Sequence, residues 1–189
     1  MESAQCYWIL TRLSRTKSTL ERGLERHATN TVLEPTYNPI LLGRASSLAS
    51  DIAFFLQVPE ATWESHPAHT ALLLSRPKAF IEYTSRLKEI SDSSDPSLLL
   101  SHAYVRYLGD LSGGQVIRRR VAEAYELDIE SGEGIKFYDF KNLGGTRSTI
   151  ADLRKIKEWY RAGLSVGTGE NETLKGKQPY SHINALNIK

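Results

Sequence analysis

The chain is poor in the features that mark several classes of protein. It has a single cysteine, Cys6, so no disulfide can form within the chain, which fits a reducing compartment. Its formal net charge is only +2, whereas nucleic-acid binders usually carry a strong basic excess. No apolar run approaches the roughly 18–20 residues of a membrane-spanning helix, and the first residues, MESAQCYWIL, lack the pattern of a secretory signal. We therefore expect a cytoplasmic protein without a transmembrane anchor or a nucleic-acid partner.

What the chain does have is helical periodicity. With 189 residues, 40% of them hydrophobic, it is long enough for one domain with its own core. Apolar residues recur at helical spacing in five segments, and no internal repeat or hairpin signal is present. The pattern predicts an all-α single domain with helices at about 7–27, 39–58, 68–90, 95–125 and 149–164.

Local signals set the expected helix boundaries. Pro59 closes the second helix, and Pro77 breaks or kinks the third because proline lacks an amide proton. Asp95-Pro96 is a suitable N-cap and first position for the fourth helix. Thr149 and Asp152 form a capping-box-like pair at the start of the fifth, and Gly163 and Gly167 are expected to stop it.

The fourth helix contains the unusual stretch HAYVRYLGDLSGGQVIRRR, residues 102–120, with glycine at 109, 113 and 114. Each glycine in a helix interior costs about 0.8–1 kcal/mol relative to alanine. On a helix, Arg106, Gly109, Asp110 and Gly113 share one stripe, where a flat ligand could approach the backbone. Arg106 and Asp110, four residues apart, can form an ion pair beside this stripe. The alternative is close helix–helix packing, and the spacing does not decide between the two.

Two basic clusters accompany this stretch. Arg154, Lys157 and Arg161 share one face of the fifth helix, which suits a ligand with paired carboxylates. The alternative for them is a solvated basic face. The cluster at 118–120 is three arginines near a helix end, which is more typical of a solvated face than of a nucleic-acid site.

The segment HAYVRYLGDLSGGQ closely resembles the central motif of the heme oxygenase family. The flanking segments are similar to that family in order and spacing, from residue 19 to residue 164: Leu20-Glu21-Arg22, Pro35-Thr36-Tyr37, Asp51-Ile52-Ala53-Phe54-Phe55, Ser131-Gly132-Glu133-Gly134, Phe137-Tyr138-Asp139-Phe140 and 155–161. The resemblance implies a multi-helical fold that uses heme as both cofactor and substrate. It further implies cleavage of heme to biliverdin, carbon monoxide and ferrous iron, with O2 and with electrons from an NADPH-dependent flavoprotein reductase.

The resemblance also assigns roles to single residues. Gly109 and Gly113 would line the distal face of heme, and Asp110 and Arg106 would belong to a proton-donating water network. The heme propionates would meet three residues: Tyr104, Lys157 and Arg161. Phe137 would pack near the porphyrin, although its aromatic ring suits a core position equally well.

The chain departs from the family at both ends. The family's axial histidine precedes the helix matching Leu20-Glu21-Arg22, so its expected position falls before Met1. None of the five histidines is a convincing substitute: His27, His66, His69, His102 and His182. We expect a divergent amino end at 1–18, a heme-oxygenase-like domain at 19–164 and a flexible polar tail at 165–189. Two functions follow, an enzyme at the surface of the endoplasmic reticulum membrane or a non-catalytic protein that binds porphyrin weakly or not at all.

Overall fold

The computed structural model describes residues 2–75, 77–142 and 144–169, and for residues 2–9 and 72 the backbone alone. Its helices are α1 (Glu2–Arg26), α2 (Pro39–Leu42), α3 (Ala45–Leu56), α4 (Pro67–Leu74), α5 (Lys78–Asp92), α6 (Leu99–Ser112), α7 (Gly114–Ala124) and α8 (Ile150–Gly167). Three 3-10 turns join them, η1 (Glu34–Thr36), η2 (Trp63–Ser65) and η3 (Lys136–Tyr138). In the described part of the chain, β pairing is limited to one bridge, between Lys141 and Arg147. The predicted all-α fold is confirmed.

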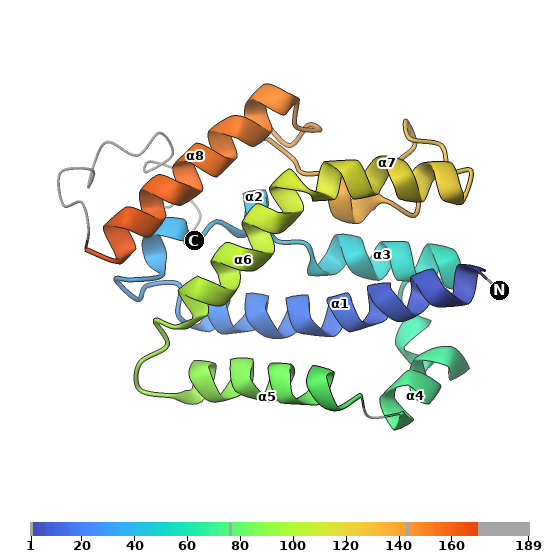
Figure 1. Ribbon diagram of the computed structural model, residues 1–189, viewed down its shortest axis with the longest axis horizontal. Helices are drawn as coiled ribbons and strands as arrows, with labels where there is room; N and C mark the ends of the chain where they lie inside the picture. Colours follow the sequence, from blue (N-terminus) through green and yellow to red (C-terminus); the bar gives the residue numbers. More distant parts are fainter. Residues whose placement is uncertain (1, 76, 143, 170–189) are drawn as a thin grey trace.

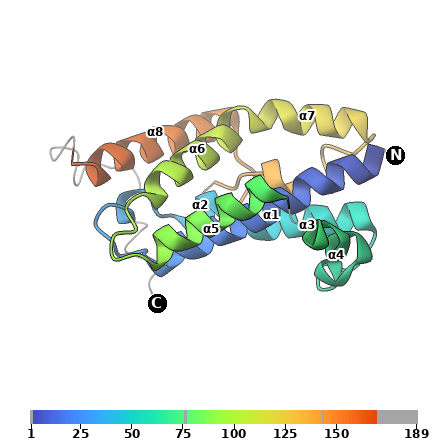
Figure 2. The same ribbon diagram turned by 60° about the horizontal axis from the view of Figure 1, so that its bottom comes forward.

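The helices form two layers (Figures 1 and 2). The long helix α1 runs across the molecule in one layer, with α3 packed on one side of it and α5 on the other. Helices α6, α7 and α8 form the second layer, which Figure 2 shows along the top of the molecule. Helix α6 contacts α1 and α5 of the first layer as well as α7 and α8 of its own, so it joins the two layers at the centre of the fold.

The buried side chains form two clusters. One gathers around α1, α6 and α8 and includes Tyr107, Trp159 and Tyr160. The other lies between α3, α7 and η3 and includes Ile52 and Phe137. The loop that follows α7 therefore packs as a core element through its aromatic residues rather than lying on the surface.

The predicted helix at 39–58 is two helices, because α1 interrupts it. The Glu21 carboxylate of α1 accepts hydrogen bonds from the backbone N–H groups of Arg44 and Ala45, at 2.7 and 3.1 Å. These bonds satisfy the first donors of α3, a role that a local N-cap side chain usually plays. The predicted break at Pro77 is confirmed, since α4 ends at Leu74 and α5 begins at Lys78.

The same 39–58 segment includes a window that meets the length and composition of a membrane helix. It is Pro39–Leu56, with a mean hydropathy of 1.3. The sequence analysis did not expect such a window. Leu41, Leu48 and Ile52 within it are fully buried in the two clusters, as in a core helix of a globular protein, so the window is weak evidence for a membrane span.

The fourth predicted helix begins later than expected and is divided. Asp95 accepts a hydrogen bond from the Ser97 N–H at 3.0 Å, which makes a turn, and α6 begins only at Leu99. The expectation that Asp95 caps this helix is therefore wrong. The chain then breaks at Gly113, between α6 and α7, as the glycine and serine content of this stretch suggests.

The fifth helix has the predicted start and a later end. The Thr149 and Asp152 capping box is present in full. Gly163 does not stop α8, which continues to Gly167. A side chain at Gly163 would meet the Pro35 carbonyl oxygen at 2.3 Å, so this glycine allows α8 to pack against η1.

These bounds also place the expected chain ends. Residues 2–18, expected as a divergent end, form most of α1. Residues 165–167, expected in the tail, belong to α8, and the tail from residue 170 onward lies outside the described residues.

Candidate functional site

The glycines of α6 and α7 have different surroundings. A Cβ added at Gly109 would meet nothing within 4 Å, and one at Gly113 would meet only the Gly109 carbonyl oxygen, at 3.6 Å. At Gly114 a Cβ would lie 3.0 Å from the Tyr138 ring. Packing against the Tyr138 ring of η3 thus accounts for Gly114, whereas Gly109 and Gly113 face open space.

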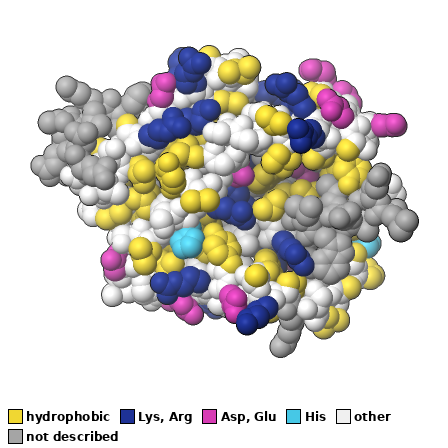
Figure 3. Space-filling view, viewed as in Figure 1, with side chains coloured by type: hydrophobic (Ala, Val, Ile, Leu, Met, Phe, Trp, Pro, Cys, Tyr) yellow, Lys and Arg dark blue, Asp and Glu magenta, His cyan; other side chains and the backbone are white. Residues whose placement is uncertain are grey.

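Two exposed apolar side chains lie one turn away from the open glycines, one on each side. Val105, one turn before Gly109, is 67% exposed, and Val116, one turn after Gly113, is 56% exposed. We call Val105, Gly109, Gly113 and Val116 the open face. Figure 3 shows hydrophobic side chains on either side of α6, and Lys or Arg side chains both at the centre of this face and along its edges. Exposed apolar patches of this kind commonly mark binding surfaces.

Asp110 does not pair with Arg106. Its Oδ2 atom accepts a hydrogen bond from the Lys17 ammonium, in an ion pair that joins α6 to α1. Arg106 instead donates to the Thr16 hydroxyl at 2.7 Å. The predicted Arg106–Asp110 ion pair is therefore wrong. Two successive residues of α1 take these side chains as partners, Thr16 for Arg106 and Lys17 for Asp110.

Lys17 is a site residue that sequence reasoning missed. Its side chain is fully buried, and its Nζ lies 4.6 Å from the centre of the Tyr107 ring and 5.7 Å from that of Phe137. Burial lowers the pKa of Lys17, and Asp110 acts against that shift. Removing one partner of a buried pair typically costs about 3–5 kcal/mol, because the other charge stays buried alone.

A signal for Lys17 was present in the sequence. Lys17 is four residues after Leu13 and three before Leu20, so it falls on the apolar stripe of α1. A lysine on such a stripe requires a buried acidic partner, and the stripe itself does not identify which carboxylate that is.

The three predicted propionate contacts lie on neighbouring helices. Tyr104 of α6 is 40% exposed, Lys157 of α8 is half-buried and Arg161 of α8 is exposed. Tyr160, between the two basic residues, has a pKa raised by burial and further by the nearby Tyr104. Tyr104 of α6 is therefore near enough to Tyr160 of α8 to influence its pKa.

Phe137 lies in the core. It is 1% exposed, and its ring packs edge to face with Tyr138, with the ring centres 4.9 Å apart. Its N–H donates to the Asp51 carboxylate at 2.8 Å. The sequence allowed two roles for Phe137, porphyrin contact or core packing, and these contacts are those of a core residue.

The described histidines are engaged in local contacts. His27 contacts the Ser91 carbonyl oxygen at 2.7 Å, and His102 contacts the Tyr83 hydroxyl at 3.3 Å. His66 caps α4, and His69 packs against Trp63. His182 lies outside the described residues. Within the described ranges, no group of three or more His, Cys, Asp or Glu side chains is arranged to hold a metal ion.

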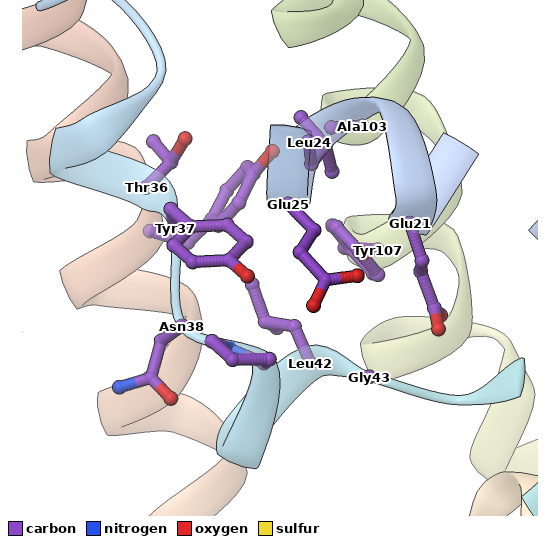
Figure 4. Close-up of a pocket in the computed structure, with 12 residues that line it drawn as sticks. Glu21, Leu24, Glu25, Thr36, Tyr37, Asn38, Leu42, Gly43, Ala103 and Tyr107 are labelled. Atoms are coloured by element: carbon purple, nitrogen blue, oxygen red, sulfur yellow. The ribbon is translucent and has the colours of Figure 1, made fainter. Parts of the chain in front are cut away.

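Two hollows lie away from the open face. A cavity of about 170 Å³ lies between α1, α6, α8 and the segment 36–43. Figure 4 shows Glu25 and Tyr37 pointing toward one another across it. The cavity is smaller than the roughly 300–1,000 Å³ usual for ligand pockets. A groove of about 980 Å³ runs along α1 between α3 and α5, and its lining is mainly polar, with Arg15, Arg22 and Lys88 among its residues.

Known structures share this architecture. Heme oxygenase-2 from Synechocystis sp. PCC 6803, solved in complex with heme and NO, matches with a TM-score of 0.73 at 30% identity, over 97% of this chain and 68% of that one. A heme oxygenase from Leptospira interrogans matches with a TM-score of 0.70 at 29% identity, over 97% and 81% of the two chains. The protein thus has the all-α fold of heme oxygenases.

Sequence comparison identifies the family itself. The family model described as heme oxygenase matches residues 3–173. Heme oxygenase 1 from Bos taurus is 38% identical over 146 residues, which are 77% of this chain and 44% of that protein. Heme oxygenase 2 from Synechocystis is 36% identical over 148 residues, or 78% and 52% of the two chains. The chain belongs to the heme oxygenase family, and it spans about half the length of these curated relatives.

Proposed function

We propose that this chain takes heme as its substrate and cleaves it oxidatively to biliverdin, carbon monoxide and ferrous iron, with O2 as the oxidant. The observation that carries the proposal is the open space above Gly109 and Gly113. The electrons would come from an NADPH-dependent flavoprotein reductase. This partner and a cytoplasmic place at the endoplasmic reticulum surface stay predictions from the family resemblance.

The residues at the open face fit a flat tetrapyrrole. Glycines without side chains let a planar ring approach the helix backbone, and Val105 and Val116 offer apolar contact beside them. Lys157 and Arg161 provide positive charge on α8 for the two propionates, and Tyr104 provides a hydroxyl donor on α6. Heme, when bound, supplies the redox chemistry and the meso carbon that is attacked.

Asp110 gives the open face a proton-handling group. Its carboxylate lies on α6 between the two open glycines and is partly exposed. A carboxylate in this place accepts a hydrogen bond from a water above the face and fixes that water beside the ring. Proton transfer by a positioned side chain or its water typically contributes 10²–10⁴-fold to a rate.

A second candidate is a protein that binds porphyrin without turning it over. The observation that favours it is that two histidine rings already make local contacts. His27 contacts Ser91, and His102 contacts Tyr83. Heme iron commonly needs an axial ligand.

Hemin titration and turnover separate the two functions. The purified chain is mixed with hemin, the Soret band is recorded, and biliverdin is measured after addition of reductase and NADPH. Asp110→Ala should bind hemin within about threefold of the unchanged chain and lose most ring opening. Gly109→Leu should weaken hemin binding, because its side chain fills the open space.

Matched controls are available on α5. Asp92→Ala removes an exposed carboxylate, and Ala79→Leu enlarges an exposed position. Both should behave as the unchanged chain. Full biliverdin yield from Asp110→Ala would remove the assignment of Asp110, and a Soret band without biliverdin from the unchanged chain would favour the second candidate.

A further inference from the structure

Lys17 lies where the two core clusters meet. Its ammonium is over Tyr107, a member of the cluster around α1, α6 and α8, and also over Phe137, a member of the cluster around α3 and η3. Aromatic faces attract a cation but do not accept its protons as a carboxylate does. The Lys17 ammonium instead donates a hydrogen bond to Asp110, a residue 93 positions away in the sequence.

The pair treats the two oxygens of Asp110 differently. Oδ2 accepts from Lys17, whereas Oδ1 has no hydrogen-bond partner among the described residues. The Asp110 side chain is 20% exposed while that of Lys17 is 0% exposed. One oxygen is therefore held toward the core, and the carboxylate reaches solvent beside the open face.

The competing cation is kept away. Arg106 is one turn before Asp110 on α6, a spacing that favours an ion pair on a helix surface. The Thr16 hydroxyl holds its guanidinium, which lies 6.0 Å from the centre of the Tyr83 ring. Lys17 of α1 pairs with Asp110 through Oδ2, and Arg106 is bound to Thr16, so Arg106 does not contact Oδ1 of Asp110.

We propose that Lys17 is a positioning residue, which orients the Asp110 carboxylate so that Oδ1 stays available to a water or ligand atom at the open face. This inference rests on the proposed function for its catalytic consequence. Its structural part, the orientation of Asp110, holds in the heme-free protein and can be tested there.

The test uses Lys17→Met, which keeps the length of the side chain and removes its charge. The matched control is Lys88→Met, which removes an exposed lysine of α5. In the heme-free protein, the 13C resonance of the Asp110 carboxyl carbon should move in Lys17→Met and stay in place in Lys88→Met. With hemin, Lys17→Met should bind within threefold of the unchanged chain and open the ring at least tenfold more slowly in a single turnover.

Lys17→Arg keeps the charge and guards against a variant that fails to fold. It should recover at least a third of the ring-opening rate, which a purely packing role for the lysine would not produce. An unmoved Asp110 resonance in Lys17→Met, or an unchanged ring-opening rate with a moved resonance, would overturn the inference. If the unchanged chain binds hemin and produces no biliverdin, the proposed function fails, and the carboxyl resonance alone then supports or overturns the positioning of Asp110.

Discussion

At the scale of single residues, three helical glycines have three different surroundings. Gly109 faces open space, Gly114 faces the Tyr138 ring and Gly163 faces the Pro35 backbone. Gly109 and Gly163 lie inside their helices, where a glycine costs about 0.8–1 kcal/mol relative to alanine, and Gly114 is the first residue of α7. The contacts that each glycine allows are different. The role of a glycine therefore follows from what a side chain at its position would touch.

This difference predicts that the same substitution changes stability differently at two of these glycines. Gly109→Ala should raise the free energy of unfolding of the heme-free protein by about 0.8–1 kcal/mol, because alanine favours the helix and nothing lies within 4 Å of its Cβ. Gly114→Ala should gain less or lose stability, since the Tyr138 ring lies 3.0 Å away. Urea unfolding followed by circular dichroism measures both. A loss of stability in Gly109→Ala would show that the face is covered in solution.

At the scale of elements, helix α8 is placed by backbone contact. Side chains at Gly163 and Gly167 would meet the carbonyl oxygens of Pro35 and Val32, each at 2.3 Å. Trp159 and Tyr160 are fully buried on the same helix. This close approach anchors α8, and with it the side chains of Lys157 and Arg161, next to α6.

Enlarging this contact should separate the two elements. Gly163→Ala is expected to lower the free energy of unfolding by about 1–3 kcal/mol or more, because a rigid carbonyl cannot yield to the new methyl group. Amide hydrogen exchange should speed up in α8 before it does in α5. Glu158→Ala, an exposed change on α8, is the control and should stay within about 0.5 kcal/mol. Equal stability of the two variants would contradict the packing described here.

At the scale of the whole molecule, one half-buried and one buried carboxylate connect elements that are distant in the sequence. Glu21 caps the start of α3, and Asp51 of α3 accepts the N–H groups of Lys136 and Phe137, both at 2.8 Å. Burial raises the pKa of Asp51 to about 7, although the two N–H donors act in the opposite direction. The second core cluster thus contains a group that titrates near neutral pH.

Asp51 makes the stability of the protein depend on pH. Its pKa is higher in the folded state, about 7, than its ordinary value of 3.8, so the folded state holds the proton more tightly between these values. The contribution to stability is therefore full below about pH 4 and is lost as the pH rises through about 7. Denaturant unfolding at pH 4 to 8 should show a loss of roughly 1–4 kcal/mol from this group.

Asp51→Asn supplies the comparison, because an amide does not titrate in this range. The unfolding free energy of the unchanged chain minus that of Asp51→Asn should fall as the pH rises from 4 to 7, because only the unchanged chain loses stability by ionising Asp51. If the unchanged chain instead gains stability relative to Asp51→Asn over this range, Asp51 is ionised throughout, and its two N–H donors outweigh its burial.

The sequence by itself determined the features that depend on neighbours within a few residues. The break before Pro77, the capping box of Thr149 and Asp152 and the interruption at Gly113 follow from local backbone chemistry. The long motif that contains Gly109 and Asp110 was sufficient to predict the family, which the comparisons confirm. The sequence could also show that Lys17 falls on an apolar stripe.

Only the tertiary structure decided which distant groups meet. Glu21 divides 39–58 into two helices, Thr16 takes Arg106 away from Asp110, and Lys17 pairs with a carboxylate 93 residues further along the chain. No local pattern encodes these contacts, because the partner of a buried charge depends on which helices pack together. For the same reason the openness of Gly109 and the crowding of Gly114 became distinct only once the neighbours of α6 and α7 were in place.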